Sequence, residues 1–300
     1  MSPLSPKFRR TLVRNLQGYA FVSLAVVGMI AFELGPMVQS FWLSFTEYDI
    51  LTKPQFVGLR NYSQIIRDEL FWVSLRNTAY YVGVSIPLRL AIALWLAMLL
   101  NQKVRGIGVF RTLFYLPTVT AGVAVALLWQ WVFEPTFGLV NYVLRFFGIN
   151  GPAWLGDPSW AMPAIIIVAC WQVGPQMLIF LAGLQSVPVQ LYEAAELDGA
   201  SPWQKFVNVT LPLISPIVFF NLVVGIIQSF QVFDKVYIMT GGGPMQATLV
   251  YVMYLYQRAF SYLEMGYGSA LAWILFMIIF ILTLIQFRAS KWVYYEGSPR

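Results

Sequence analysis

The sequence predicts an all-α polytopic membrane protein with six transmembrane helices. Two features of its composition support this prediction: 59% of its 300 residues are hydrophobic, and only 11% are charged. The mean hydropathy of +0.68 lies far outside the range of soluble proteins. Several apolar runs reach about 20 residues, the length that a helix rising about 1.5 Å per residue needs to cross a bilayer. The composition therefore excludes a soluble globular domain.

Hydropathy places the spans in order along the chain, and several of them contain prolines within or near their ends. Such prolines are tolerated in lipid when neighbouring helices satisfy the freed carbonyl groups. The basic segment 1–17 leads into an apolar run that is too long for a signal peptide and lacks a small-residue cleavage site, so we interpret that run as a retained span. The predicted spans cover residues 18–45, 71–100, 111–133, 160–185, 213–233 and 267–287.

Basic residues in the short loops predict the orientation, because Lys and Arg gather on the cytoplasmic side. Three clusters fall on one side if the chain crosses six times, whereas the opposite loops mix both signs. We therefore expect a cytoplasmic segment 1–17, a transmembrane domain 18–288 and a cytoplasmic tail 289–300. The clusters consist of Lys7, Arg9, Arg10 and Arg14; of Lys103, Arg105 and Arg111; and of Arg288, Lys291 and Arg300.

Residue types that the chain lacks exclude several kinds of chemistry. It has no histidine, which removes imidazole from any catalytic or metal-binding scheme, and its one cysteine, Cys170, cannot form an intrachain disulfide. No G-x-x-x-x-G-K-[ST] motif is present to hold the phosphates of ATP. The GGGP run that begins at Gly241 lacks a following lysine and is typical of a tight turn. We expect no cofactor on this chain and an energy source in a partner.

The stretch LYEAAELDGASPWQKFVNVTLPL, residues 191–213, is an acidic loop on the predicted cytoplasmic side. Helix formers lead to Gly199, which suits the left-handed residue that ends a helix. Ser201, Pro202 and Gln204 then have the spacing of a capping box that starts a second helix, and Pro212 is expected to close the unit. The pattern predicts a rigid two-helix knob. A plain solvated connector is the alternative, but the rigidity and the acidic face favour a docking surface.

The spacing of EAA at Glu193, Gly199 and LP at Leu211 resembles the EAA loop of binding-protein-dependent ABC importer permeases. That family has isoleucine two residues before the leucine, where this chain has Val209. The likeness extends along nearly the whole chain and points to the carbohydrate (sugar) permease branch. The further segments are FVGLRNYSQII at Phe56, FRTLFYLPTV at Phe110, AGLQSVPVQLYEAAELDGAS at Ala182, TGGGPMQAT at Thr240 and YGSALAWILF at Tyr267.

The resemblance implies a type I ABC importer permease fold in a bacterial or archaeal cytoplasmic membrane. It implies that the loop 186–212 seats in a cleft of a separate ATPase, and that this chain is a transport subunit and not an enzyme. The implied partners are a second permease subunit (usually a different chain), two ATPase subunits that hold ATP and Mg²⁺, an extracytoplasmic solute-binding protein, a small-molecule sugar and the lipid bilayer, with no nucleic acid. The implied coupling residues are Glu193, Ala194, Ala195, Asp198, Gly199, Leu211 and Pro212.

Polar residues inside the predicted spans mark a candidate cargo path, because such residues are costly in lipid. Amides both donate and accept hydrogen bonds, which suits sugar hydroxyl groups, and aromatic rings offer flat apolar faces to a sugar ring. Each amide could instead join two helices. The role of Glu33, an acid inside the first span, stays open. The candidates are Trp129 and Gln130, Gln172 and Gln176, and Asn221, Gln228, Ser229 and Gln231.

Three alternatives compete with a sugar permease. A permease for a non-sugar solute would share every feature of the loop. A self-sufficient secondary transporter or channel would be favoured by inverted repeats and paired ionisable residues at mid-membrane, and the sequence shows neither. A membrane-embedded enzyme would need a nucleophile, an acid–base pair or a metal cluster, and none is assembled.

Overall fold

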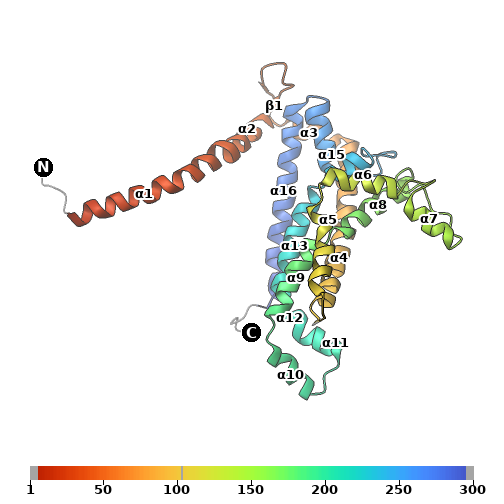
Figure 1. The fold of residues 1–300 in the computed structure, drawn as a ribbon. Coiled ribbons are helices and arrows are strands. Elements are labelled where there is room, and N and C mark those ends of the chain that lie inside the picture. Colours follow the sequence, from red (N-terminus) through yellow and green to blue (C-terminus); the bar gives the residue numbers. More distant parts are fainter. Residues whose placement is uncertain (1–5, 103, 295–300) are drawn as a thin grey trace. The chain divides into compact units, whose positions relative to one another are not determined.

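The computed structural model describes residues 6–102 and 104–294 (Figure 1). Two of the basic residues used for the orientation, Lys103 and Arg300, lie outside the described residues, as do the side chains of Lys7, Arg9, Arg10 and Arg14. The chain divides into two compact units. The first comprises the described residues up to Ile65 with Arg258–Trp273, and the second comprises Ile66–Gln257 with the described residues from Ile274 onward.

Helices long and apolar enough to cross a membrane are present as predicted. Within the described ranges, three single helices meet that test: Gln17–Leu43, Glu69–Leu100 and Met265–Trp292. Three further pairs of helices, each joined at a sharp bend, meet it when each pair is taken as one span. Counting each bent pair as one span gives up to six spans among the described residues, the predicted number, although the first half of the third pair, Pro202–Leu213, precedes the predicted fifth span.

The first unit contains the N-terminal helix and a small antiparallel hairpin. Asn61 ties its turns together, because its side-chain amide donates to the carbonyls of Ser44 and Thr46, at 2.9 Å each. Glu33 lies in a π-helical turn that interrupts the first span. The elements are α1 (Pro6–Met29), η1 (Ile30–Leu34), α2 (Gly35–Leu43), β1 (Thr46–Glu47), β2 (Gln55–Phe56), the start of α3 (Arg60–Arg67), η3 (Gln257–Ser261) and the start of α16 (Met265–Ala289).

The second unit is built around α4 (Glu69–Leu100), which packs against α8, α9, α13 and α15. The Asp68 carboxylate caps the start of α4 by accepting from the Leu70 N–H at 2.9 Å. Near its other end, small and branched side chains such as Ala93 and Ala97 pack against Met177 and Phe180 of α9. The remaining elements of the unit are α5 (Ile107–Val119), α6 (Gly122–Val132), α7 (Leu139–Phe146), α8 (Pro158–Trp171), α9 (Gly174–Ser186), α10 (Val189–Leu197), α11 (Pro202–Lys205), η2 (Phe206–Thr210), α12 (Leu211–Leu213), α13 (Ser215–Phe230), α14 (Asp234–Met239), α15 (Tyr251–Tyr256) and η4 (Ser290–Trp292).

The third and fourth predicted spans each consist of two helices, and the fifth, residues 213–233, starts at a bend. α5 and α6 meet at 98°, α8 and α9 at 44°, and the segment Pro202–Leu213 meets α13 at 65°. Pro175 and Pro216 stand in the first turns of α9 and α13, where the missing N–H has no helical partner to lose. Pro175 and Pro216 therefore mark the starts of new helices, whereas Pro87, Pro117 and Pro163 lie inside α4, α5 and α8.

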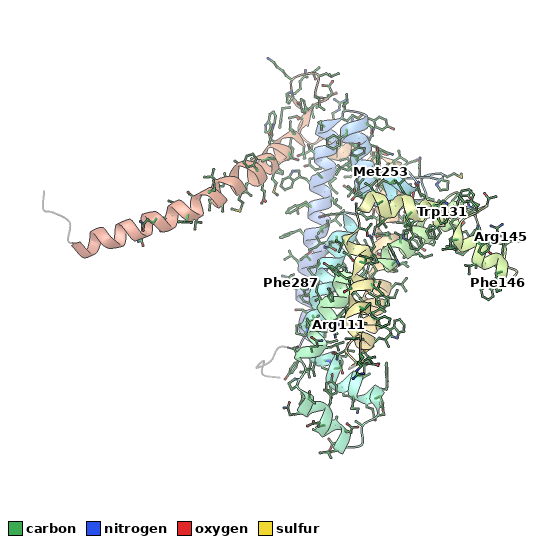
Figure 2. All side chains as sticks on the ribbon, in the orientation of Figure 1. Arg111, Trp131, Arg145, Phe146, Met253 and Phe287 are labelled. Atoms are coloured by element: carbon green, nitrogen blue, oxygen red, sulfur yellow. The ribbon has the colours of Figure 1, made fainter. Side chains whose placement is uncertain are left out.

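The segment between α6 and α8 is a compact excursion that carries α7 (Figure 2). Glu134 opens it by accepting from the main-chain N–H groups of Phe137 and Thr136, at 2.8 and 2.7 Å. These bonds stabilise the charged carboxylate and lower the pKa of Glu134. Asn141 closes the segment, because its side chain accepts from the Trp154 indole at 2.7 Å. Phe146 remains 84% exposed at the end of α7.

The bend between α8 and α9 depends on a glycine. A Cβ at Gly174 would lie 2.8 Å from Thr118 Oγ1, 2.9 Å from the Phe114 carbonyl oxygen and 3.0 Å from Tyr115 Cα. Two of these atoms belong to the backbone of α5 and cannot turn away. Only glycine therefore allows α9 to approach α5 this closely.

We expect Gly174→Ala to destabilise the protein by about 1–3 kcal/mol, the usual cost of overpacking. Gly83→Ala is the matched control, because a Cβ at this α4 position meets nothing within 4 Å. Thermal unfolding of the purified protein in detergent should show a lower melting temperature for Gly174→Ala alone. Equal melting temperatures for the two variants would show that the approach of α9 to α5 is not tight.

Candidate functional site

The acidic loop forms the predicted turn after its first helix. α10 ends at Asp198, and Gly199 follows with a φ of +77°. The Gly199 N–H donates to the Glu196 carbonyl at 3.0 Å, and the Ala200 N–H donates to the Ala195 carbonyl at 2.9 Å. This pair of bonds is the Schellman motif, which satisfies carbonyls at the end of a helix. The predicted helix end at Gly199 is confirmed.

The predicted capping box at the start of the second helix is also confirmed. The Gln204 N–H donates to Ser201 Oγ at 3.3 Å, and the Ser201 N–H donates to Gln204 Oε1 at 2.7 Å. The helical path continues through η2 and α12 to Leu213, and the bend into α13 follows, so the unit ends one residue after Pro212, close to where the sequence predicted. The wider π-helical turn before Pro212 lets the chain pass the residue that lacks an N–H.

Side chains join the two halves of the loop into one body, here named the knob (residues 189–213). The Tyr192 hydroxyl lies 2.9 Å from Thr210 Oγ1, and Lys205 Nζ lies 3.7 Å from Glu196 Oε1. In Figure 1, α10 and α11 lie beyond the ends of α9 and α12. The knob leaves Leu197 91% exposed and Trp203 70% exposed. Apolar tips beside acids are suited to contact with another protein.

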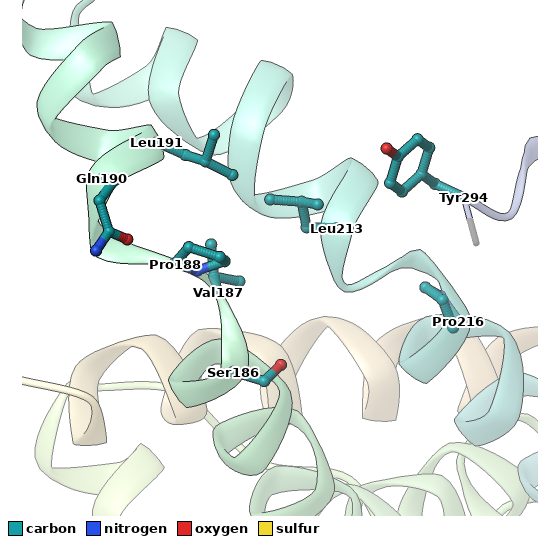
Figure 3. Close-up of a pocket in the computed structure, with 8 residues that line it drawn as sticks. All are labelled: Ser186, Val187, Pro188, Gln190, Leu191, Leu213, Pro216 and Tyr294. Atoms are coloured by element: carbon teal, nitrogen blue, oxygen red, sulfur yellow. The ribbon is translucent and has the colours of Figure 1, made fainter. Parts of the chain in front are cut away.

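A hollow of about 530 Å³ separates the knob from the helices that carry it (Figure 3). It lies where α9 passes into α10 and where α12 passes into α13. The main-chain N–H of Tyr294, one of its lining residues, donates to Ser215 Oγ at 2.8 Å. The lining residues are Ser186, Val187, Pro188, Gln190, Leu191, Leu213, Pro216 and Tyr294.

Three of the candidate cargo residues use their amide N–H groups within the protein. Gln130 donates to the carbonyls of Ile238 and Met239, at 2.8 and 3.2 Å, and so joins α6 to α14. Gln172 donates to the Pro117 carbonyl at 3.3 Å and joins the second bend to α5. Asn221 is buried and donates to the Ile217 carbonyl of its own helix at 3.2 Å. These contacts are those of structural amides.

Two other candidates have buried polar atoms that make no hydrogen bond within the described residues. Trp129 stands edge-to-face with Trp171, with ring centroids 5.6 Å apart. The Trp129 indole N–H and the Gln176 side-chain oxygen are buried without a hydrogen-bond partner among the described residues. Ser229 is buried, whereas Gln228 and Gln231 are exposed. The structure thus separates the candidates into a structural group and a group with free polar atoms.

The sequence analysis missed two basic residues near these candidates, Arg89 and Lys235. Arg89 lies on α4 about 17 Å from Leu100, at about 1.5 Å per residue. A charge at this depth costs about 2.5–3.5 kcal/mol on insertion scales. Its Nη1 donates to Ser229 Oγ at 3.4 Å, while its buried Nε has no partner within the described chain. The signal was available, because Arg89 falls inside the second predicted span, but only acids inside the spans were weighed.

Lys235 stands in the first turn of α14, next to Asp234. Burial and the nearby charge of Arg89 lower the pKa of Lys235 to about 8, while the carboxylate of Asp234 acts in the opposite direction. The carboxylate of Asp234 lies beside α6, 4.0 Å from the position of a Cβ at Gly122. The ion pairs found within residues 6–102 and 104–294 include neither Arg89 nor Lys235.

Comparison with known proteins identifies the family of this chain. Residues 89–293 match the family described as "Binding-protein-dependent transport system inner membrane component". The chain belongs to this family. The match contains the knob, all three bent pairs and the last turns of α4, from Arg89 to Leu100. The chain is therefore a membrane protein and a subunit of a transport system.

Individual relatives agree with the family. The chain is 45% identical over 290 residues to "Probable ABC transporter permease protein YesP" of Bacillus subtilis (strain 168), covering 95% of this chain and 94% of that one. It is 33% identical over 279 residues to "Trehalose/maltose transport system permease protein MalF" of Thermococcus litoralis, covering 91% and 93%. These relatives are transport permeases, which agrees with a transport subunit.

A solved structure shares the fold of this family member. It comes from a bacterial ABC transporter involved in the import of the acidic polysaccharide alginate. The TM-score is 0.85 at 23% sequence identity, over 96% of this chain and 100% of that chain. The predicted ABC importer permease fold is confirmed.

We expect Gly199→Val to open the turn of the knob, since a left-handed residue with a Cβ costs about 1–2 kcal/mol. A Cβ at Gly199 would meet nothing within 4 Å, so the penalty comes from the backbone alone. Amide hydrogen exchange of residues 189–205 should be roughly 5–30 times faster than in the unchanged protein. Gly199→Asn is the control, because asparagine tolerates this conformation. Unchanged exchange in Gly199→Val would contradict the strained turn.

Proposed function

We propose that this chain is a permease subunit of an ATP-driven, binding-protein-dependent importer for a sugar or a related polyol-type solute. The observation that carries the proposal is the knob, an exposed body with both helix ends capped, on a bundle of bent spans. A relative named for trehalose and maltose transport supports a sugar as cargo. The free indole N–H of Trp129 and the free oxygen of Gln176 support a site for hydroxyl groups.

The knob is the proposed contact with a separate ATPase. Glu193, Asp198 and Leu197 are exposed on it, so its surface offers two carboxylates and an apolar tip. A rigid body transmits displacement better than a flexible connector, and the Tyr192–Thr210 and Lys205–Glu196 contacts supply that rigidity. When ATP draws the ATPase subunits together, the knob moves with them. α9 and α13 carry that movement toward the bends.

The bends are the proposed moving parts of the cargo path. Helices that are broken at membrane depth occur where backbone is buried in protein or lines a cavity. Here the breaks near Thr120 and Gln172 lie close together, as the Gln172 contact with the Pro117 carbonyl shows. The sugar site proposed near Trp129, Trp171 and Gln176 opens in turn to each side of the membrane as the bends change.

The complete importer contains more than this chain. We propose a second, different permease subunit, two ATPase subunits that bind ATP and Mg²⁺, and an extracytoplasmic solute-binding protein, in a bacterial or archaeal cytoplasmic membrane. Both termini and the knob lie in the cytoplasm. This chain contributes the path and the mechanical link, while ATP hydrolysis belongs to its partner.

We expect Glu193→Lys to uncouple ATP hydrolysis from sugar uptake, because it reverses a charge on the surface of the knob that is proposed to contact the ATPase. A hydrogen bond to a charged group contributes about 1.5–3 kcal/mol, so uptake at fixed ATPase activity should fall roughly tenfold or more. The measurement is sugar uptake and phosphate release in vesicles that contain the whole complex.

Glu69→Lys is the matched control for this experiment. It makes the same charge change at an exposed residue in the first turn of α4, far along that helix from Leu100. Its uptake should remain close to that of the unchanged complex. Full uptake in Glu193→Lys would show that the acidic face of the knob does not dock the ATPase.

A further inference from the structure

Two basic side chains, Arg89 and Lys235, interact electrostatically beside the proposed sugar site, with Asp234 as the acid that acts on Lys235. Arg89 reaches across from α4 to Ser229 on α13, with its Nη1 3.4 Å from the serine oxygen. The positive charge of Arg89 acts electrostatically on Lys235 of α14. Asp234 is the acidic residue that acts on Lys235. The cluster of Arg89, Lys235 and Asp234 therefore carries an excess of one positive charge.

One N–H donor of the Arg89 guanidinium makes no hydrogen bond within the described residues. Its Nε is buried and finds no acceptor within the described residues, while its Nη1 makes one long contact to a neutral hydroxyl. Arginine is suited to bind an oxyanion through two parallel N–H donors. A buried donor without an acceptor, next to a second cation, indicates that an anion completes the site.

The cluster adjoins the aromatic part of the sugar site. α4, which carries Arg89, packs against α8, and α14, which carries Lys235, packs against α6. α8 carries Trp171, whose ring stands edge-to-face with Trp129 of α6. The neighbour of Trp129, Gln130, holds α14 through the carbonyls of Ile238 and Met239. A sugar against the indole rings would therefore bring a charged substituent within reach of the two cations.

We infer that Arg89 and Lys235 form an oxyanion-recognition site in the cargo path, and that the cargo is a sugar carrying an acidic group. This inference rests on the proposed function and names the substrate class of the same site. Arg89 binds two oxygens of the anion, Lys235 adds charge from α14, and Ser229 orients the guanidinium. Asp234 limits the excess charge, so that the site holds its anion without retaining it too tightly for transport.

The test compares three probes that differ at one carbon atom: cellobiose, cellobiouronate, which has a carboxylate there, and cellobiose 6′-phosphate. Uptake is measured with the intact complex in proteoliposomes. The unchanged complex should have a half-saturation concentration for an acidic probe at least about tenfold below that for cellobiose, equivalent to one good charge-assisted contact. Preference for the carboxylate or for the phosphate identifies the oxyanion, and either result supports the site.

Arg89→Gln and Lys235→Gln should each reduce about tenfold the preference for the acidic probe, measured as the ratio of the half-saturation concentrations for cellobiose and for that probe. Arg76→Gln is the matched control, because it removes an exposed charge from the same helix. Should Arg89→Gln fail to assemble, Lys235→Gln tests the same site from another helix.

Two results would overturn the inference. One is an unchanged complex that takes up cellobiose as well as either acid, and the other is an equal loss of all three probes in both variants. In both cases ATP-driven uptake of cellobiose by the unchanged complex would still support the proposed function. Absence of ATP-driven uptake for every probe would instead contradict the proposed function itself.

Discussion

Main-chain N–H and C=O groups in hydrocarbon must find partners inside the protein, and this constraint governs how the spans of this chain can bend. The chain breaks its helices near Thr120 and near Gln172, which frees backbone groups at membrane depth. The two breaks lie against each other, so that polar groups at one break can bond to backbone groups at the other. Gln172 donates to the Pro117 carbonyl, and Gly174 lets α9 lie directly on the backbone of α5. Two of the cargo candidates, Gln172 and Gln176, lie at this junction.

The same junction links the membrane part to the knob. α9 begins at the break and runs to Ser186, and α10 follows after two residues. α9 packs along α4 through Met177 and Phe180. A hollow of about 530 Å³ lies at its far end, beside the knob. In the proposed mechanism, a displacement of the knob would be transmitted along α9 to the break, where a small change in angle would alter which side chains face the path.

Local signals in the sequence predicted local structure well. Gly199 and the Ser201–Gln204 pair belong to motifs whose hydrogen bonds lie within a few residues, so their spacing alone specifies them. The apolar runs likewise predicted the spans. What the sequence could not show is which partner each polar group would find. Gln130 and Gln172 bond to carbonyls on other helices, contacts that depend on the packing of distant segments. The bends depend on the same packing, since a proline permits a kink without requiring one.

The sidedness of the bundle tests this mechanism most directly, because the knob and the excursion that carries α7 must lie on opposite faces of the membrane. The lone cysteine can be replaced in Cys170→Ala, and single cysteines then introduced by Leu197→Cys on the knob and Phe146→Cys on α7, residues 91% and 84% exposed. A membrane-impermeant maleimide should label Leu197→Cys only in inside-out vesicles and Phe146→Cys only in right-side-out vesicles. Labelling of both from one face, or of Leu197→Cys from outside, would contradict coupling through a cytoplasmic knob.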